Sequence, residues 1–216
     1  MISANGRVQQ PGAWSYTDYN DYTFKDFKDY PAASKRIQPD SIDYKLLHAA
    51  VFYATNAQRY KKHLPPFQHS PALEYAARAY SLDMVIYDFF SHKSPVTGKT
   101  NLADRLSQVG LNMGYRAENI AIAFALEYKS GRPVYTPAQN GGYFSYTHRG
   151  PALEYRTYLD VAETVVRQWM NSPGHRRNIL NSNLKYLGIG AAFYRQHDFY
   201  NMGAFKITQN FSSEDM

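Results

Sequence analysis

The stretch YLGIGAAFYRQHDFYNMGAFKITQNF, residues 186–211, decides the fold. Two apolar, β-favouring halves, 186–195 and 202–211, flank a short polar link at 196–201, a pattern that predicts an antiparallel hairpin. A third stretch, Glu118–Phe124, is apolar enough to predict another strand. Strands and helices alternate only once along the chain, which argues against a parallel doubly wound sheet.

Working outward from the hairpin, helical periodicity accounts for most of the remaining regular sequence. Apolar residues recur at helical spacing over four stretches, which are about 40–63, 70–90, 101–109 and 158–170. Asp40 or Ser41 is the expected N-cap of the first helix, and Ser70 that of the second. Ser172 followed by Pro173 repeats the serine-proline start of a further helix. We therefore expect an α+β fold, with a small, mostly antiparallel sheet covered by helices.

Composition bounds the possible chemistry. The chain has 216 residues, enough for one domain with an appendage, and its 44% hydrophobic and 19% charged content is that of a globular protein. It contains no cysteine, which excludes disulfides, thiolate metal sites and cysteine nucleophiles, so any metal must rest on His, Asp or Glu. The net charge of +6 comes without a dense basic run, so we expect no nucleic-acid partner. No apolar stretch reaches the roughly 18 residues of a transmembrane helix.

Aromatic residues are in excess, with 20 Tyr and 12 Phe, and they define two unusual segments. Residues 1–39 are tyrosine-rich without any period, which predicts an extended arm docked on a domain formed by 40–216. Residues 125–158 are rich in Gly, Pro and Tyr and too long for an ordinary connection, which is typical of a functional insertion or lid. The start of the chain lacks the basic-then-apolar pattern of a secretion signal, so we expect any such leader to lie outside this sequence.

Candidate site residues occur at the expected ends of elements. His92 lies where the second helix gives way to a loop, Glu118 begins the apolar strand, and His175 lies in the first turn of the helix after Pro173. Two imidazoles and a carboxylate can bind a divalent cation or transfer protons near neutral pH, if the fold brings them together. The other histidines have no such setting, and we assign them surface or packing roles: His48, His63, His69, His148 and His197.

The order of several motifs resembles the bacterial branch of the CAP superfamily, which comprises cysteine-rich secretory proteins, antigen 5 and pathogenesis-related 1 proteins. These motifs are TNAQRYKKHLPPF (55–67), FFSHKSP (89–95), TNLADRLSQVGL (100–111), AENIAIA (117–123), VVRQWMNSPGHRRNIL (165–180), YLGIGAAFYR (186–195) and KITQNF (206–211). The resemblance covers about residues 41–211. It implies a three-layer α-β-α sandwich, and secretion or display at the cell surface.

The resemblance also implies a central cleft lined by His92, Glu118, Ser172 and His175. The second acidic residue of eukaryotic members falls on Ser172, which supplies no carboxylate, and we expect Ser172 to cap a helix instead. The insertion could cover the cleft or supply a replacement ligand such as His148 or Glu154.

The leading hypothesis from the sequence is a secreted or cell-surface binding protein. His92, Glu118 and His175 would hold a divalent cation, zinc first among them, and the partner would be an extracellular lipid, peptide or cell-wall component. No enzymatic activity is assigned. The alternative is a hydrolase of peptides or cell-wall material with Glu118 as general base. A third interpretation is lipid, glycan or surface recognition by exposed aromatic rings in the arm and insertion, among them Tyr135, Tyr143, Phe144, Tyr146, Tyr155 and Tyr158.

Overall fold

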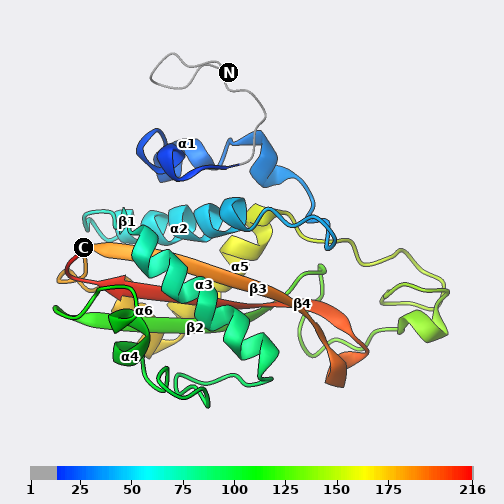
Figure 1. Ribbon diagram of the computed structural model, residues 1–216. Helices are drawn as coiled ribbons and strands as arrows, with labels where there is room; N and C mark the ends of the chain where they lie inside the picture. The colour runs from blue at the N-terminus through cyan, green and yellow to red at the C-terminus, as the bar shows by residue number, and fades with distance from the viewer. Residues whose placement is uncertain (1–13, 216) are drawn as a thin grey trace.

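A four-stranded sheet forms the centre of the molecule in the computed structural model, which describes residues 14–215 (Figure 1). The strand order is β1-β3-β4-β2. The predicted hairpin is confirmed: β3 (Tyr186–Gln196) and β4 (Met202–Ser212) run antiparallel, with a 3₁₀ turn, η4 (His197–Phe199), in their link. β2 (Arg116–Phe124) pairs antiparallel with β4. The two-residue strand β1 (Gln68–His69) runs parallel to β3 and was not predicted, because two residues show no period.

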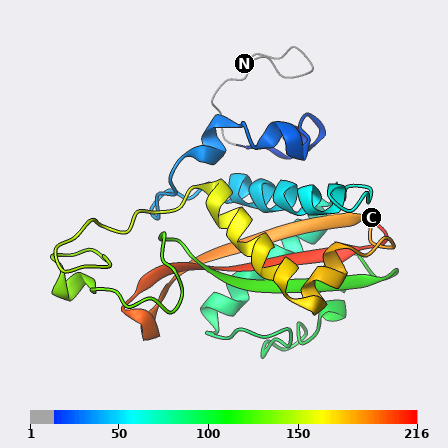
Figure 2. The same cartoon turned by 180° about the vertical axis from the view of Figure 1, so that it is seen from behind.

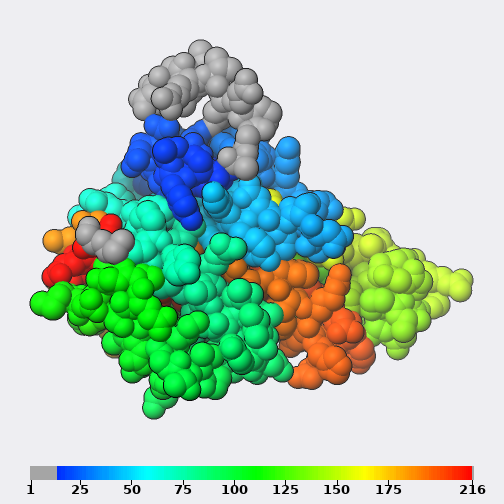
Figure 3. All heavy atoms as spheres, in the orientation of Figure 1, coloured from blue at the N-terminus to red at the C-terminus, as the bar shows by residue number. Residues whose placement is uncertain are grey.

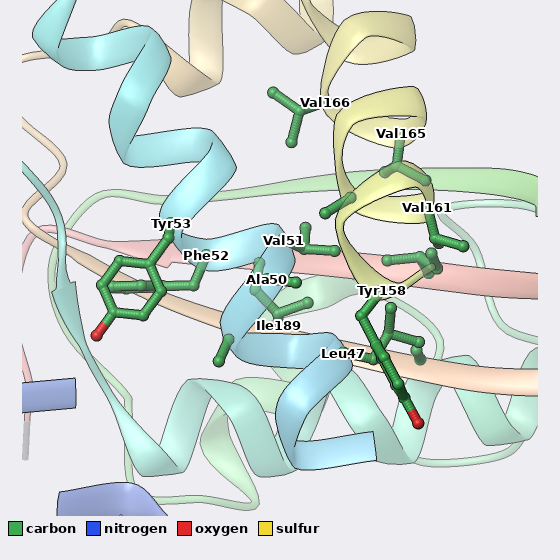
Figure 4. Packing of buried hydrophobic residues seen from close by; sticks show 14 of the residues in the cluster. Leu47, Ala50, Val51, Phe52, Tyr53, Tyr158, Val161, Val165, Val166 and Ile189 are labelled. Carbon is green, nitrogen blue, oxygen red and sulfur yellow. The ribbon is translucent and has the colours of Figure 1, made fainter. Parts of the chain in front are cut away.

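Helices cover both faces of this sheet, so the predicted α+β layering is confirmed (Figures 1 and 2). On one face lie α2 (Tyr44–Tyr60), α5 (Tyr158–Asn171) and α6 (Pro173–Ile179). On the other lie α3 (Pro71–Ile86) and α4 (Leu102–Ser107). Because successive strand residues face opposite ways, Ile189 of β3 packs between α2 and α5, beside Val51 and Val165 (Figure 4).

Capping groups set the helix boundaries. Ser70 caps α3 as predicted, its hydroxyl accepting a hydrogen bond from the Leu73 amide. α2 begins later than predicted because Asp43, rather than Asp40 or Ser41, accepts the hydrogen bond from Leu46 N. α3 also ends earlier than predicted, before Asp88, whose left-handed backbone (φ of 46°) is a conformation that stops helices.

The N-terminal arm lies along α2 (Figure 1). The prediction of an extended conformation was wrong: it folds into three short turns, η1 (Tyr16–Asn20), α1 (Phe24–Phe27) and η2 (Pro31–Ser34). Thr23 and Asp26 close α1 through a reciprocal capping box, a local interaction that needs no long-range period. Trp14 and Phe27 are buried against Tyr53 of α2, with ring centroids 5.9 and 4.6 Å from it. The first 13 residues of the predicted arm lie outside the described residues.

A second contact of the arm uses two of the histidines that the sequence assigned to packing. The buried Glu74 carboxylate binds His48 Nδ1 at 3.0 Å and His69 Nε2 at 2.6 Å. Burial opposes ionisation of Glu74, but these two hydrogen bonds outweigh it and lower the pKa of the carboxyl to about 2. Tyr19 of the arm stacks on the His69 ring with centroids 3.7 Å apart. The arm therefore docks on a buried polar group as well as on apolar rings.

The insertion, residues 125–158, projects from the end of β2 at Phe124 (Figures 1 and 2). It contains a short turn, η3 (Pro137–Gln139), and a small core of its own in which Tyr128 and Phe144 pack with Met202 of β4. It is thereby attached to the β3–β4 hairpin.

Candidate functional site

Glu118 is the buried centre of the candidate site. On β2 it points to the face covered by α3 and α4, and it is 8% exposed. Its Oε2 accepts a hydrogen bond from Arg105 Nη2 at 2.6 Å, and its Oε1 lies 2.8 Å from His92 Nδ1. Arg105 comes from α4 and is buried too, with its guanidinium 3.5 Å from the centroid of the Tyr80 ring. Both carboxylate oxygens are therefore already engaged by side chains of this chain.

His92 is held by Glu118 but remains open to solvent. It lies in the loop between α3 and α4, and its side chain is 53% exposed. A carboxylate accepts hydrogen bonds, so the His92–Glu118 contact places a proton on Nδ1 and, in the neutral ring, leaves Nε2 with its lone pair. The hydrogen bond at Nδ1 thus fixes the tautomer of His92 and makes Nε2 the nitrogen that can accept a hydrogen bond or bind a ligand.

His175 approaches His92 from the opposite face of the sheet. The two ring centroids are 6.3 Å apart. Burial, and after it the neighbouring His92 ring, lowers the pKa of His175 below its ordinary value of 6.5. His175 is therefore neutral at neutral pH, and the pair presents two imidazoles side by side.

The free edge of β2 brings α6 to this position. Side chains of α5 and α6 occupy outward-facing carbonyls of that edge: Trp169 Nε1 donates to Ile120 O at 3.0 Å, and Asn178 Nδ2 donates to Glu118 O at 3.3 Å. An edge strand needs such partners to satisfy its backbone. Asn119 Nδ2 also donates to His175 O, at 3.2 Å. These contacts at the edge of β2 therefore place His175 beside His92, which reaches the same edge from the loop between α3 and α4.

The donor set does not fit the predicted three-residue metal site. Across residues 14–215, no three His, Asp or Glu side chains are grouped so that they could hold a metal ion. Glu118 faces Arg105 and His92 instead, which leaves the two imidazoles as the ordinary metal-binding groups at the site.

Comparison with known proteins agrees with this arrangement of elements. A model of the cysteine-rich secretory protein family, CAP, matches residues 114–211. The uncharacterized protein YkwD of Bacillus subtilis (strain 168) is 33% identical over 136 residues, 63% of this chain. The crystal structure of an extracellular protein containing a SCP domain from Bacillus anthracis str. Ames superposes with a TM-score of 0.53 at 25% identity, over 84% of this chain.

Residues 114–211 thus carry the match to the CAP family, and the chain is similar to bacterial proteins of that family. It spans 38% of the length of YkwD and 45% of the B. anthracis chain. Within residues 14–215, no helix has the length and apolar character needed to cross a bilayer.

Other residues singled out by the sequence lie elsewhere in the structure. Ser172 occupies the N-cap position of α6, as predicted, but its hydroxyl makes no capping hydrogen bond. Glu154 lies 3.9 Å from Arg36, and His148 contacts the Tyr135 ring, both in the insertion beyond the far end of β2. The insertion therefore brings neither of them to Glu118 as a replacement ligand.

Sequence reasoning missed Arg105, which the site depends on most. The sequence indicated Arg105 in one way: this cation lies on the same side of a short helix as the apolar residues Leu102 and Leu106 in TNLADRLSQVGL. A buried arginine needs a partner, and that alone would have directed a search for a buried carboxylate.

Proposed function

We propose that this chain is a secreted or cell-surface CAP protein that acts by binding, with His92 and His175 as its contact groups and Glu118 as a positioning residue. The observation that carries this proposal is the contrast between a carboxylate bound on both oxygens and a His92 ring that is 53% exposed. Such a carboxylate orients the imidazole for an external group. The extracellular description of the B. anthracis structure supports the location.

The two imidazoles suit a divalent cation of the zinc type, which histidine nitrogen binds readily. Glu118 would hold His92 in the ligating tautomer rather than bind the ion itself. Two protein ligands leave the remaining positions to water or to a group of the partner. Acid weakens such binding, because protonated imidazoles have no lone pair to donate.

Zinc titration by calorimetry tests this assignment. We expect His92→Ala and His175→Ala each to lower the affinity for Zn²⁺ by about tenfold or more, since each removes one of two protein ligands. His197→Ala is the matched control, because its ring is 95% exposed and lies beyond the far end of β3, away from Glu118. Equal affinity of the wild type and both site variants would rule the assignment out.

The hydrolase interpretation requires Glu118 to accept a proton from water. Its oxygens are held by Arg105 and His92, so the geometry favours orientation over proton transfer. Turnover of a peptide or peptidoglycan panel that disappears with Glu118→Gln, in a variant that remains folded, would overturn the binding assignment.

A second candidate function is supported by a separate groove of about 900 Å³ between the arm, α2 and α5. Its apolar floor includes Ala54, Ala57, Leu159, Val166 and Met170. The lining also carries four cationic residues, Lys25, Lys28, Lys61 and Arg167, and two acidic ones, Asp29 and Glu163, so cations are in excess. An apolar floor beside cations suits a molecule with a hydrocarbon chain and an anionic head. We propose a fatty acid as the occupant of this groove.

Displacement of a fluorescent fatty acid tests the groove. Ala57→Trp should fill the floor and lower the affinity by about tenfold, equivalent to about 1.4 kcal/mol. Ala103→Trp, on the exposed side of α4, adds the same ring away from the groove and should leave the affinity unchanged. Unaltered binding in the Ala57 variant would exclude this location.

A further inference from the structure

A depression of about 430 Å³ lies between the insertion and the β3–β4 hairpin, two segments that sit side by side at one end of the molecule (Figure 3). Its apolar base includes Leu126 and Phe144, which are buried. The volume falls within the range of about 300–1,000 Å³ that small-molecule sites occupy.

Three tyrosines line this depression, from both segments. Tyr143 and Tyr155 belong to the insertion and are half-buried, whereas Tyr200 belongs to the hairpin and is 61% exposed. Tyr200 and Asn201 both have left-handed backbones, with φ of 52° and 59°, a conformation that is costly for a tyrosine. Two consecutive left-handed residues are a common conformation in hairpin links, and this turn places Tyr200 at the depression.

The depression also carries an uncompensated positive charge. Arg195, at the end of β3, lines it and forms no ion pair or side-chain hydrogen bond with any residue in 14–215. Residues 125–158 contain four basic and two acidic side chains. Both acidic ones, Glu127 and Glu154, lie within ion-pair distance of Arg36, at 2.7 and 3.9 Å. An anionic group entering here therefore meets no competing carboxylate of this insertion.

We propose that this depression binds a uronic-acid residue of an acidic glycan. A pyranose ring has an apolar C–H face, which packs against tyrosine rings, and a polar rim, which hydrogen-bonds to groups such as the Tyr hydroxyls and the Asn201 amide. The sugar carboxylate pairs with the planar guanidinium of Arg195, which can bind it through two parallel hydrogen bonds. Stacking and the ion pair together distinguish an acidic sugar from a neutral sugar and from a simple anion.

This site is independent of the imidazole pair. Glu118 and Gly188 both lie opposite Asn210 of β4, and Arg195 is seven residues farther along β3 than Gly188. At the rise of a β-strand this separation is about 23 Å. Variants that abolish binding at the imidazole pair should therefore leave glycan binding at the depression intact, and the reverse.

Calorimetry with trigalacturonic acid, and with its methyl ester as the neutral probe, tests the proposal. We expect the acid to bind and the ester to bind about tenfold more weakly or not at all. Arg195→Gln should reduce binding of the acid to the level of the ester. Tyr200→Asn should also reduce binding about tenfold, and asparagine tolerates the left-handed backbone at this position.

Matched controls separate the site from general effects. Arg177→Gln removes an exposed arginine of α6, and Tyr75→Ala removes a ring that is 67% exposed on α3. Both should bind the acid as the wild type does. Absence of binding, equal binding of acid and ester, or unchanged binding in the Arg195 and Tyr200 variants would each overturn the proposal.

Discussion

Arg105→Ala should lower the free energy of unfolding by about 3–5 kcal/mol, because it leaves the Glu118 carboxylate buried without its cation. Arg105 is 4% exposed and Glu118 is 8% exposed, so water does not replace the lost partner. The guanidinium also donates to Lys99 O at 3.2 Å, and this contact helps to hold the loop that carries His92. The variant should therefore be less stable and less ordered at His92.

Thermal and urea unfolding measure this effect. For a chain of this size the melting temperature should fall by about 2–4 °C for each kcal/mol lost. Asp198→Ala is the control, because that carboxylate is 98% exposed and its removal should leave the melting temperature unchanged. The double variant Arg105→Met with Glu118→Leu removes both charges and should recover much of the loss. A single variant as stable as the wild type would contradict the structural role given to this ion pair.

The sequence predicted those parts of the fold that have a local signal. The hairpin, the serine cap of α3 and the helix after Thr157 follow from alternation, capping and helical spacing. The turns of the arm and the two residues of β1 are shorter than any period, and so they were missed or wrongly described. Periodicity requires length, which these segments lack.

The candidate site shows a similar division. His92, Glu118 and His175 were singled out, and the fold brings Glu118 to His92 and the two rings to 6.3 Å. Whether they bind a ligand stays a prediction. The neutralisation of Glu118 by Arg105 depends on the packing of α4 against β2, a contact between segments that no spacing in the chain encodes.

The sequence YLGIGAAFYR predicted a strand, but it did not explain why two of its positions are glycine. Gly188 and Gly190 point to the face of β3 that α3 covers, opposite to Leu187 and Ile189. A Cβ on Gly188 would lie 2.0 Å from Glu74 N, and one on Gly190 would lie 2.0 Å from Arg78 N. The backbone of α3 thus rests directly on the backbone of β3, with no layer of side chains between them at these positions.

Gly190→Ala should therefore be strongly destabilising, although it adds only one methyl group. Its Cβ would meet main-chain atoms of Ala77 and Arg78, which a rotamer change cannot move, so α3 must shift away from the sheet. Overpacking a well-packed core costs about 1–3 kcal/mol and more where the neighbour cannot yield, and we expect at least the upper end of that range. The shift would also move Tyr80, on which the Arg105 guanidinium rests, and so loosen the support of Glu118.

Gly174→Ala is the matched control, because a Cβ there meets nothing within 4 Å. Gly174 lies in α6, where alanine is the better helix former, so this variant should be as stable as the wild type or slightly more stable. Urea unfolding compares the effect of the same added methyl group at a closely packed position, Gly190, and at a position with free space, Gly174. The NMR signals of His92 and His175 report whether the candidate site is disturbed. If both glycine variants unfolded like the wild type, α3 would not lie against β3 as closely as the geometry requires.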